Sequence, residues 1–160
     1  MSIKALQNQR GFSLIEAIIA MVILTIGLLA VGLMQIGAMK GNTTALTRAD
    51  GVAMAQSVMD TLISSSLDNA LLTDNGSVLD AGAATAGSPP VPGNADHAGG
   101  ELFGANPVQG VNGMNYTVFW NVADDTPIND AKTVRLFVYW DDQRFGLNRV
   151  VSTTVVGGLY

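Results

Sequence analysis

The chain has 160 residues, of which 48% are hydrophobic and 13% are charged, and its formal net charge is -5. This length suits one modest domain with one additional element. The absence of cysteine excludes disulfides, thiolate nucleophiles and cysteine metal sites. The 8 lysines and arginines are dispersed over an acidic chain, which argues against a phosphate-binding surface for nucleic acid.

A polar, basic segment at residues 1–11 is followed by a long apolar one at residues 12–39. No charged side chain occurs between Glu16 and Lys40, a run of 23 residues. About 20 apolar residues are needed for a helix to cross the hydrocarbon core of a bilayer. We therefore predict a single membrane-spanning helix, with its basic end in the cytoplasm and the bulk of the chain on the other side.

Two simpler interpretations of the apolar segment explain less. A secretory signal peptide has an apolar core of about 7–15 residues before a small-residue cleavage site, and this segment is longer. A plain membrane anchor needs no carboxylate, yet Glu16 lies inside the segment. Because an unpaired charge at membrane depth costs about 2–3 kcal/mol or more, such a residue is a candidate for function.

The residues around this carboxylate form a motif. From Gly11 to Glu16 the sequence is Gly-Phe-Ser-Leu-Ile-Glu, and it follows the basic segment directly. It resembles the recognition motif of prepilin peptidase in bacterial type IV pilins and type II secretion pseudopilins. The resemblance implies that residues 1–11 are a leader peptide, that the peptidase cuts between Gly11 and Phe12, and that the new amine of Phe12 is methylated. Glycine at the cut lets an extended backbone approach the protease without a side-chain clash.

Cleavage would create a partner for Glu16. The new α-amino group has a reference pKa of about 7.7–8.0 and is mostly protonated at neutral pH. An ammonium and a carboxylate are each costly alone in or near lipid and tolerable as a pair. The resemblance implies that Glu16 pairs with the N-terminus of a neighbouring subunit. The alternative is that Glu16 extends to the lipid headgroups and has no partner.

The sequence predicts a weak point in the helix at Lys40–Thr43, and residues 40–74 are no longer apolar on all sides. Apolar residues recur at steps of three and four, which predicts an amphipathic helix that packs on a sheet. With the first segment it would run from Phe12 to about Leu67, roughly 80 Å of helix. The predicted apolar stripe is Leu46, Ala49, Val52 or Ala53, Met59, Leu62 or Ile63, and Leu67; the predicted polar side includes Thr47, Arg48, Asp50, Ser57, Asp60, Thr61 and Ser64.

Residues 75–113 have no periodicity and are rich in glycine, alanine and proline. Such a composition orders only where it lies over another surface, so we predict a long, partly flexible surface loop. The single histidine, His97, falls in this segment near Glu101. Too few further ligands accompany it for a metal site, and we interpret it as a loop histidine.

The pattern of residues 114–160 predicts an antiparallel sheet. Three segments have strand character: Met114–Val122, Thr133–Trp140 and the β-branched Arg149–Val156. In the first two, alternation places on the apolar face, which the helix would cover, the residues Met114, Tyr116, Val118, Trp120 and Val122, then Val134, Leu136, Val138 and Trp140. Short connectors carry Asp124, Asp125 and Asp130, then Asp141 and Asp142. We interpret these acids as turn residues, since no calcium-loop spacing and no pocket accompany them. The expected fold is α+β: a long N-terminal helix packed on a small C-terminal antiparallel sheet.

The resemblance extends beyond the cleavage motif. Segments in the helix, such as Met54–Asp60, and the segment Val138–Asp142 look like the PilV family of minor pilins, the type IV pilus modification proteins. The family implies a subunit, without a cofactor, that helps to start or modify a pilus and so affects adhesion or twitching motility. Its partners would be prepilin peptidase, other pilins and the assembly machinery. It would reside in the inner membrane and then in the surface pilus.

Two other functions remain open at this point. A minor pseudopilin of a type II secretion system shares the leader, helix and sheet. A single-span anchor that presents a small β-domain as an adhesin would share the span without being assembled. No residue pattern supports an enzyme.

Overall fold

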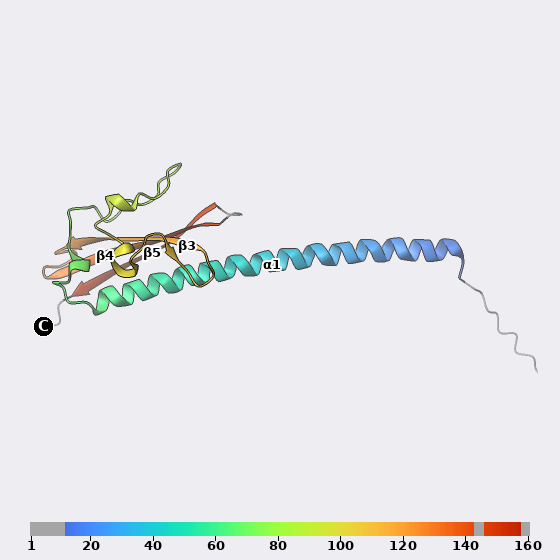
Figure 1. Ribbon diagram of the computed structural model, residues 1–160, viewed down its shortest axis with the longest axis horizontal. Coiled ribbons are helices and arrows are strands. Elements are labelled where there is room, and N and C mark those ends of the chain that lie inside the picture. Colours follow the sequence, from blue (N-terminus) through green and yellow to red (C-terminus); the bar gives the residue numbers. More distant parts are fainter. Residues whose placement is uncertain (1–11, 143–145, 158–160) are drawn as a thin grey trace, which may run out of the picture. The chain divides into compact units, whose positions relative to one another are not determined.

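The computed structural model describes residues 12–142 and 146–157, so the predicted leader, residues 1–11, lies outside the described residues. The chain divides into two compact units, Met1–Thr43 and Thr44–Tyr160. Helix α1, Leu14–Ser64, contributes residues to both units, and the second unit, called the head below, contains the sheet (Figure 1). The predicted α+β layout of a long N-terminal helix followed by a small antiparallel sheet is confirmed.

Helix α1 begins at Leu14 and ends at Ser64, close to the predicted limits of Phe12 and Leu67. It remains helical through Lys40–Thr43, where the sequence suggested a weak point. A helix-interior glycine costs only about 1 kcal/mol relative to alanine, so the one at position 41 does not by itself break a helix of this length.

The sheet has five strands in the order β1-β3-β4-β5, and β2 also pairs with β3. Every pairing is antiparallel. The three long strands were predicted, and each is extended at one or both ends. The two short ones lie in the segment predicted to be a loop, so that prediction missed them. The bounds are β1 His97–Ala98, β2 Val108–Gln109, β3 Asn115–Asp124, β4 Ala131–Asp142 and β5 Gly146–Gly157; the short helices are η1 Ala70–Leu72, η2 Pro92–Asn94 and α2 Gly100–Phe103.

One face of the sheet packs against α1 and forms the main core of the head. The predicted alternation is confirmed in β3 and β4, because the residues expected to face the helix are those in this core. The buried residues that the helix and these two strands contribute are Ala55, Val58, Met59 and Leu62 from α1, Tyr116, Val118, Trp120 and Val122 from β3, and Val134, Leu136, Val138 and Trp140 from β4.

The predicted apolar stripe of the helix was partly wrong. Leu46 is 58% exposed and Val52 is 41% exposed, whereas Thr47 and Gly51 are buried. The reason is the size of the side chains that pack against Thr47 and Gly51. The aromatic rings of Tyr116 and Trp140 fill the space beside this part of α1, so small residues, rather than large apolar ones, let the helix approach the sheet.

Gly51 provides a test of this close approach. A Cβ built at Gly51 would lie 2.9 Å from Cζ3 of the buried Trp140 ring. We expect Gly51→Ala to lower the free energy of unfolding by about 1–3 kcal/mol through overpacking, although alanine is the better helix former. Gly41→Ala is the control, because nothing lies within 4 Å of its Cβ position, and it should be neutral or stabilising. Thermal unfolding monitored by tryptophan fluorescence measures both; a stabilised Gly51→Ala protein would refute the tight contact.

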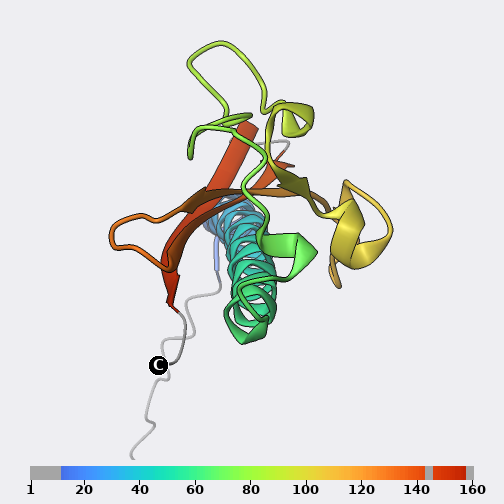
Figure 2. The same cartoon turned by 90° about the vertical axis from the view of Figure 1, so that its left-hand side faces the viewer.

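The opposite face of the sheet is covered by the glycine- and alanine-rich segment (Figure 2). Phe119, Phe137 and Tyr139 stack on one another there and are at most 1% exposed. The side chains that pack against them are small: Ala83, Ala84, Ala95 and Ala98. The N–H of Ala84 also donates a hydrogen bond of 2.9 Å to Oη of Tyr139. The low-complexity segment is therefore a covering layer, in which alanine side chains pack against aromatic ones.

Candidate functional site

The N-terminal motif lies at the start of α1. Phe12 is 85% exposed and precedes the helix, and Glu16 lies in the first helical turn and is also exposed. Gly11, the other residue of the expected cleavage site, lies outside the described residues. Ser13 caps the helix: the Glu16 N–H donates to Oγ of Ser13 at 3.3 Å and to its carbonyl oxygen at 3.1 Å.

The spacing Ser13-x-x-Glu16 is that of a capping box, which is a sequence signal for the start of a helix. It fixes Glu16 at the positive end of the helix dipole, where a negative charge is favourable. Within the described residues of this single chain, Glu16 forms no ion pair. A carboxylate is thus held at the membrane end of the helix with its charge available to another molecule.

The segment of α1 that follows is suited to a membrane. The helix is long and apolar enough to cross a bilayer, and the residues of its most apolar window are exposed within the chain. Large side chains such as Leu28 and Leu33 are 65% and 71% exposed. Exposed apolar surface on this scale requires lipid or other protein chains around it.

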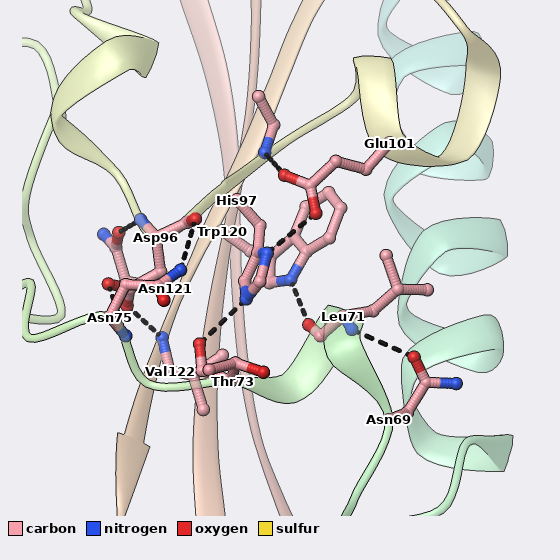
Figure 3. A network of polar contacts seen from close by, with 11 residues as sticks. Asn69, Leu71, Thr73, Asn75, Asp96, His97, Glu101, Trp120, Asn121 and Val122 are labelled. Atoms are coloured by element: carbon pink, nitrogen blue, oxygen red, sulfur yellow. Dashed lines mark hydrogen bonds and ion pairs between the residues drawn. The ribbon is translucent and has the colours of Figure 1, made fainter.

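In the head, Asp96 is the centre of a polar network that joins three parts of the chain (Figure 3). Its Oδ1 accepts the N–H groups of Asn75 and Ser77 at 3.2 and 3.1 Å, and its Oδ2 accepts the N–H of Val122 at 2.8 Å. Its own N–H donates to Oδ1 of Asn121 at 3.1 Å. One buried carboxylate thereby attaches the covering segment to β3. No sequence pattern predicts this role, since Asp96 is distinguished there only by its position before the histidine.

The histidine beside Asp96 is not a simple loop residue, and this interpretation is corrected. His97 belongs to β1, is 5% exposed and stacks on Trp120 with 5.4 Å between ring centroids. Its Nδ1 lies 2.8 Å from Oε2 of Glu101 and its Nε2 lies 2.8 Å from the carbonyl oxygen of Thr73. Each ring nitrogen therefore lies within hydrogen-bond distance of an oxygen from a different residue. These contacts join β1 to β3, to α2 and to the segment that contains Thr73, so we assign His97 a structural role.

Replacement of Asp96 should weaken this attachment strongly. In Asp96→Asn, one carboxylate oxygen becomes an NH₂ donor that faces an N–H donor, and a buried group loses its partner. We expect the free energy of unfolding to fall by about 2–4 kcal/mol, since bonds to charged groups contribute about 1.5–3 kcal/mol and unsatisfied groups cost as much again. The exposed Asp68→Asn is the charge-matched control. Chemical denaturation measures both; equal stability of the two variants would contradict the role given to Asp96.

Tyr116 links β3 to α1 in the core. Its hydroxyl donates to the carbonyl oxygen of Thr47 at 2.9 Å and accepts from Nδ2 of Asn112 at 3.1 Å. Burial raises the pKa of Tyr116 above its usual value, the Asn112 amide opposes this shift, and the negative charge of Asp50 adds to it. The folded state therefore holds this proton more tightly than the unfolded state does.

This shift predicts a dependence on alkaline pH. Because the folded pKa is raised, the stabilisation is fully present below the unfolded pKa of about 10 and is lost as the pH rises through the folded value. The free energy of unfolding of the wild-type protein should fall more steeply above pH 10 than that of Tyr116→Phe, which lacks the titrating group. Urea denaturation at several pH values compares the two slopes. Identical slopes would show that Tyr116 does not contribute.

The interpretation of the acids as turn residues holds for Asp125 and Asp130, which lie in the turn between β3 and β4. It is corrected for Asp124, the last residue of β3, and for Asp141 and Asp142, the last two of β4, because the strand pairing extends to them. Asp125 and Asp130 have positive φ values of 53° and 61°, and the N–H of Asp130 donates to Oδ1 of Asp125 at 3.0 Å. Asp124 forms an ion pair of 2.6 Å with Lys132. Among the described residues, no group of three or more His, Asp or Glu side chains is arranged to hold a metal ion.

Comparison with known proteins adds one match. A family model described as the prokaryotic N-terminal methylation motif matches residues 6–32. No curated protein and no solved structure matches the chain.

The methylation motif, the apolar helix that continues from it and the small antiparallel sheet support a type IV pilin-like protein. The motif points to a structural subunit, and it implies processing by prepilin peptidase and association with a membrane. More specifically, the motif supports a prepilin-type pilin or pseudopilin. The matched residues lie in the N-terminal part that pilins and pseudopilins share.

Proposed function

We propose that this protein is a minor type IV pilin that helps to start or modify a pilus. The observation that carries the proposal is the match of the methylation motif to residues 6–32, which continues into the exposed apolar part of α1. The leader, residues 1–11, is removed by prepilin peptidase between Gly11 and Phe12, and the amine of Phe12 is methylated. The precursor spans the inner membrane once, with its N-terminus in the cytoplasm and its head in the periplasm.

Assembly depends on Glu16 in this proposal. The α-amino group of Phe12 exists only after cleavage, and it carries the charge opposite to that of Glu16. Ser13 caps the first turn of α1, which contains Glu16. Among the described residues of the single chain, Glu16 forms no ion pair. A neighbouring subunit can therefore supply the missing cation, and an uncut precursor cannot.

The minor role is supported by resemblance to the PilV family in the helix and in the segment Val138–Asp142. The absence of cysteine also departs from the many major pilins that close their C-terminal region with a disulfide. A minor subunit of this kind acts through the other pilins of the filament and through the assembly machinery. Its loss is expected to change adhesion or twitching motility.

The test has two parts. Intact-mass analysis of the protein extracted from membranes should show loss of residues 1–11 and gain of one methyl group; an uncut N-terminus would instead favour the single-span adhesin. Deletion of the gene should then reduce surface pili and leave secreted enzymes unchanged. A secretion defect with normal pili would overturn the pilus assignment in favour of a pseudopilus of type II secretion, which shares the methylation motif.

A further inference from the structure

The two edges of the sheet in the head are treated differently. On the β3 edge, strands β1 and β2 pair with parts of β3. Side chains accept hydrogen bonds from other outward backbone groups of β3. The Val118 N–H donates to Oδ1 of Asn106 at 3.0 Å, and the Val122 N–H donates to Asp96 at 2.8 Å. On the far side of β5, no other strand pairs with it among the described residues.

The direction of each backbone group on β5 follows from the register. In antiparallel strands, successive residues direct their N–H and C=O groups to opposite sides. The even residues of β3 point to the closed edge, as Val118 and Val122 do, so its odd residues bond to β4. In both registers odd residues lie opposite odd ones and even residues opposite even ones. The odd residues of β4 therefore bond to β3, and its even residues bond to the even residues of β5. The odd residues of β5 therefore direct their N–H and C=O groups away from the sheet.

These odd residues also present apolar side chains to solvent. Leu147, Val151 and Val155 are 47%, 38% and 49% exposed, whereas Val156, an even residue, is 6% exposed and belongs to the core. Natural sheets usually protect a free edge with lysine, proline, a bulge or a short strand. β5 has 12 residues, contains neither lysine nor proline, and has Arg149 as its single charge.

We propose that the free edge of β5 binds an extended segment of a different protein, which adds to the sheet as a further strand. This segment carries apolar side chains at alternate positions, next to Leu147, Val151 and Val155, and an acidic side chain opposite Arg149. Backbone hydrogen bonds supply the affinity, and the alternate side chains supply the specificity. The free edge belongs to the head, so it would be available in a pilin, a pseudopilin or an anchored adhesin alike.

A second copy of this chain fits the edge less well. The opposite edge of the sheet is closed by strands and side-chain caps, so a copy offers no second free edge for head-to-tail pairing. Pairing of β5 with itself would leave Arg149 without an opposite charge, because β5 contains no acidic residue. Arg149 also forms no ion pair with another described residue.

The test uses the full chain in detergent micelles and NMR-detected amide exchange. The probe is a short synthetic peptide that alternates valine with threonine and carries one central glutamate. Without peptide, the odd amides of β5 should exchange rapidly and the even ones slowly. Saturating peptide should slow the odd amides about tenfold or more, the equivalent of about 1.4 kcal/mol.

Val151→Pro removes one outward N–H and leaves the bonds to β4 intact, so it should abolish this protection. Val111→Pro is the matched control, because Val111 is 99% exposed at the second position of the turn closed by the Gly113 N–H and the Gly110 carbonyl oxygen. The slow even amides report whether each variant is folded. Equal protection of Val151→Pro, or no protection of the wild-type protein, would overturn the proposal.

A charge exchange gives an independent test that does not alter the backbone. Arg149→Glu should lose protection by the glutamate peptide and gain it from the same peptide with a central lysine. If the order of the two peptides is unchanged, the assignment of Arg149 is wrong. Protection of the odd amides that rises with protein concentration in the absence of peptide would identify a second copy as the occupant and would also overturn the proposal.

Discussion

Glu16→Gln is expected to leave cleavage of the precursor intact and to reduce its incorporation into filaments by about 100-fold or more. The amide has nearly the shape of the carboxylate but no charge, so the ammonium group of a neighbouring subunit would lose its partner near lipid. Loss of one member of a buried ion pair costs about 3–5 kcal/mol, and about 1.4 kcal/mol corresponds to a factor of ten. The measurement is the amount of tagged protein in sheared filaments relative to the amount in the membrane.

The control for this variant is Asp60→Asn, which removes one exposed carboxylate from the part of α1 in the head. It should enter filaments as the wild-type protein does. Because cleavage is scored separately by intact mass, a processing defect cannot be mistaken for an assembly defect. Normal incorporation of Glu16→Gln would eliminate the pairing argument, and the carboxylate would then be interpreted as extending to the lipid headgroups.

Gly11→Val should have the opposite pattern, with nearly all of the protein retained as uncut precursor. A β-branched side chain restricts the backbone and adds bulk at the position that must approach the peptidase. Without cleavage, the amine of Phe12 does not form, so neither methylation nor pairing with Glu16 follows. Intact mass of the membrane-extracted protein detects the uncut N-terminus directly.

Gly27→Val is the matched control for this change. It makes the same substitution inside the apolar part of α1, where nothing lies within 4 Å of the Cβ position. Cleavage of this variant should be normal, since the substitution lies beyond the motif. Efficient cleavage of Gly11→Val would show that the peptidase cuts at another position, and Phe12 would not be the mature N-terminus.

The long elements were predictable because each has a local signal. A charge-free run predicted the first part of α1, and period-two alternation predicted β3 and β4 together with their core-facing residues. The limits of α1 were correct to within a few residues, although Ser13 and Glu16 carry a capping signal that places its start more sharply. The charge-free run, the alternation and the capping spacing each involve residues close together in the sequence, so they can be recognised without a structure.

The errors have a common cause. The side of α1 that meets the sheet was chosen by hydrophobicity, which favoured Leu46 over the buried Thr47 and Gly51. Which residues are buried there depends on the size of Tyr116 and Trp140, about 70 to 90 positions later in the chain. Close packing rewards complementary volume, and no local pattern contains the volume of a distant partner.

By itself, the sequence determined the apolar segment that is long enough to span a membrane and the methylation motif at its start, because both consist of contiguous residues before Lys40. It also determined the α+β layout. Only the tertiary structure decided how the low-complexity segment is ordered, through Asp96 and the alanines that cover Phe119. It also decided which sheet edge remains open. A strand's free edge is defined by the absence of a neighbour in space, and one strand's sequence does not specify it.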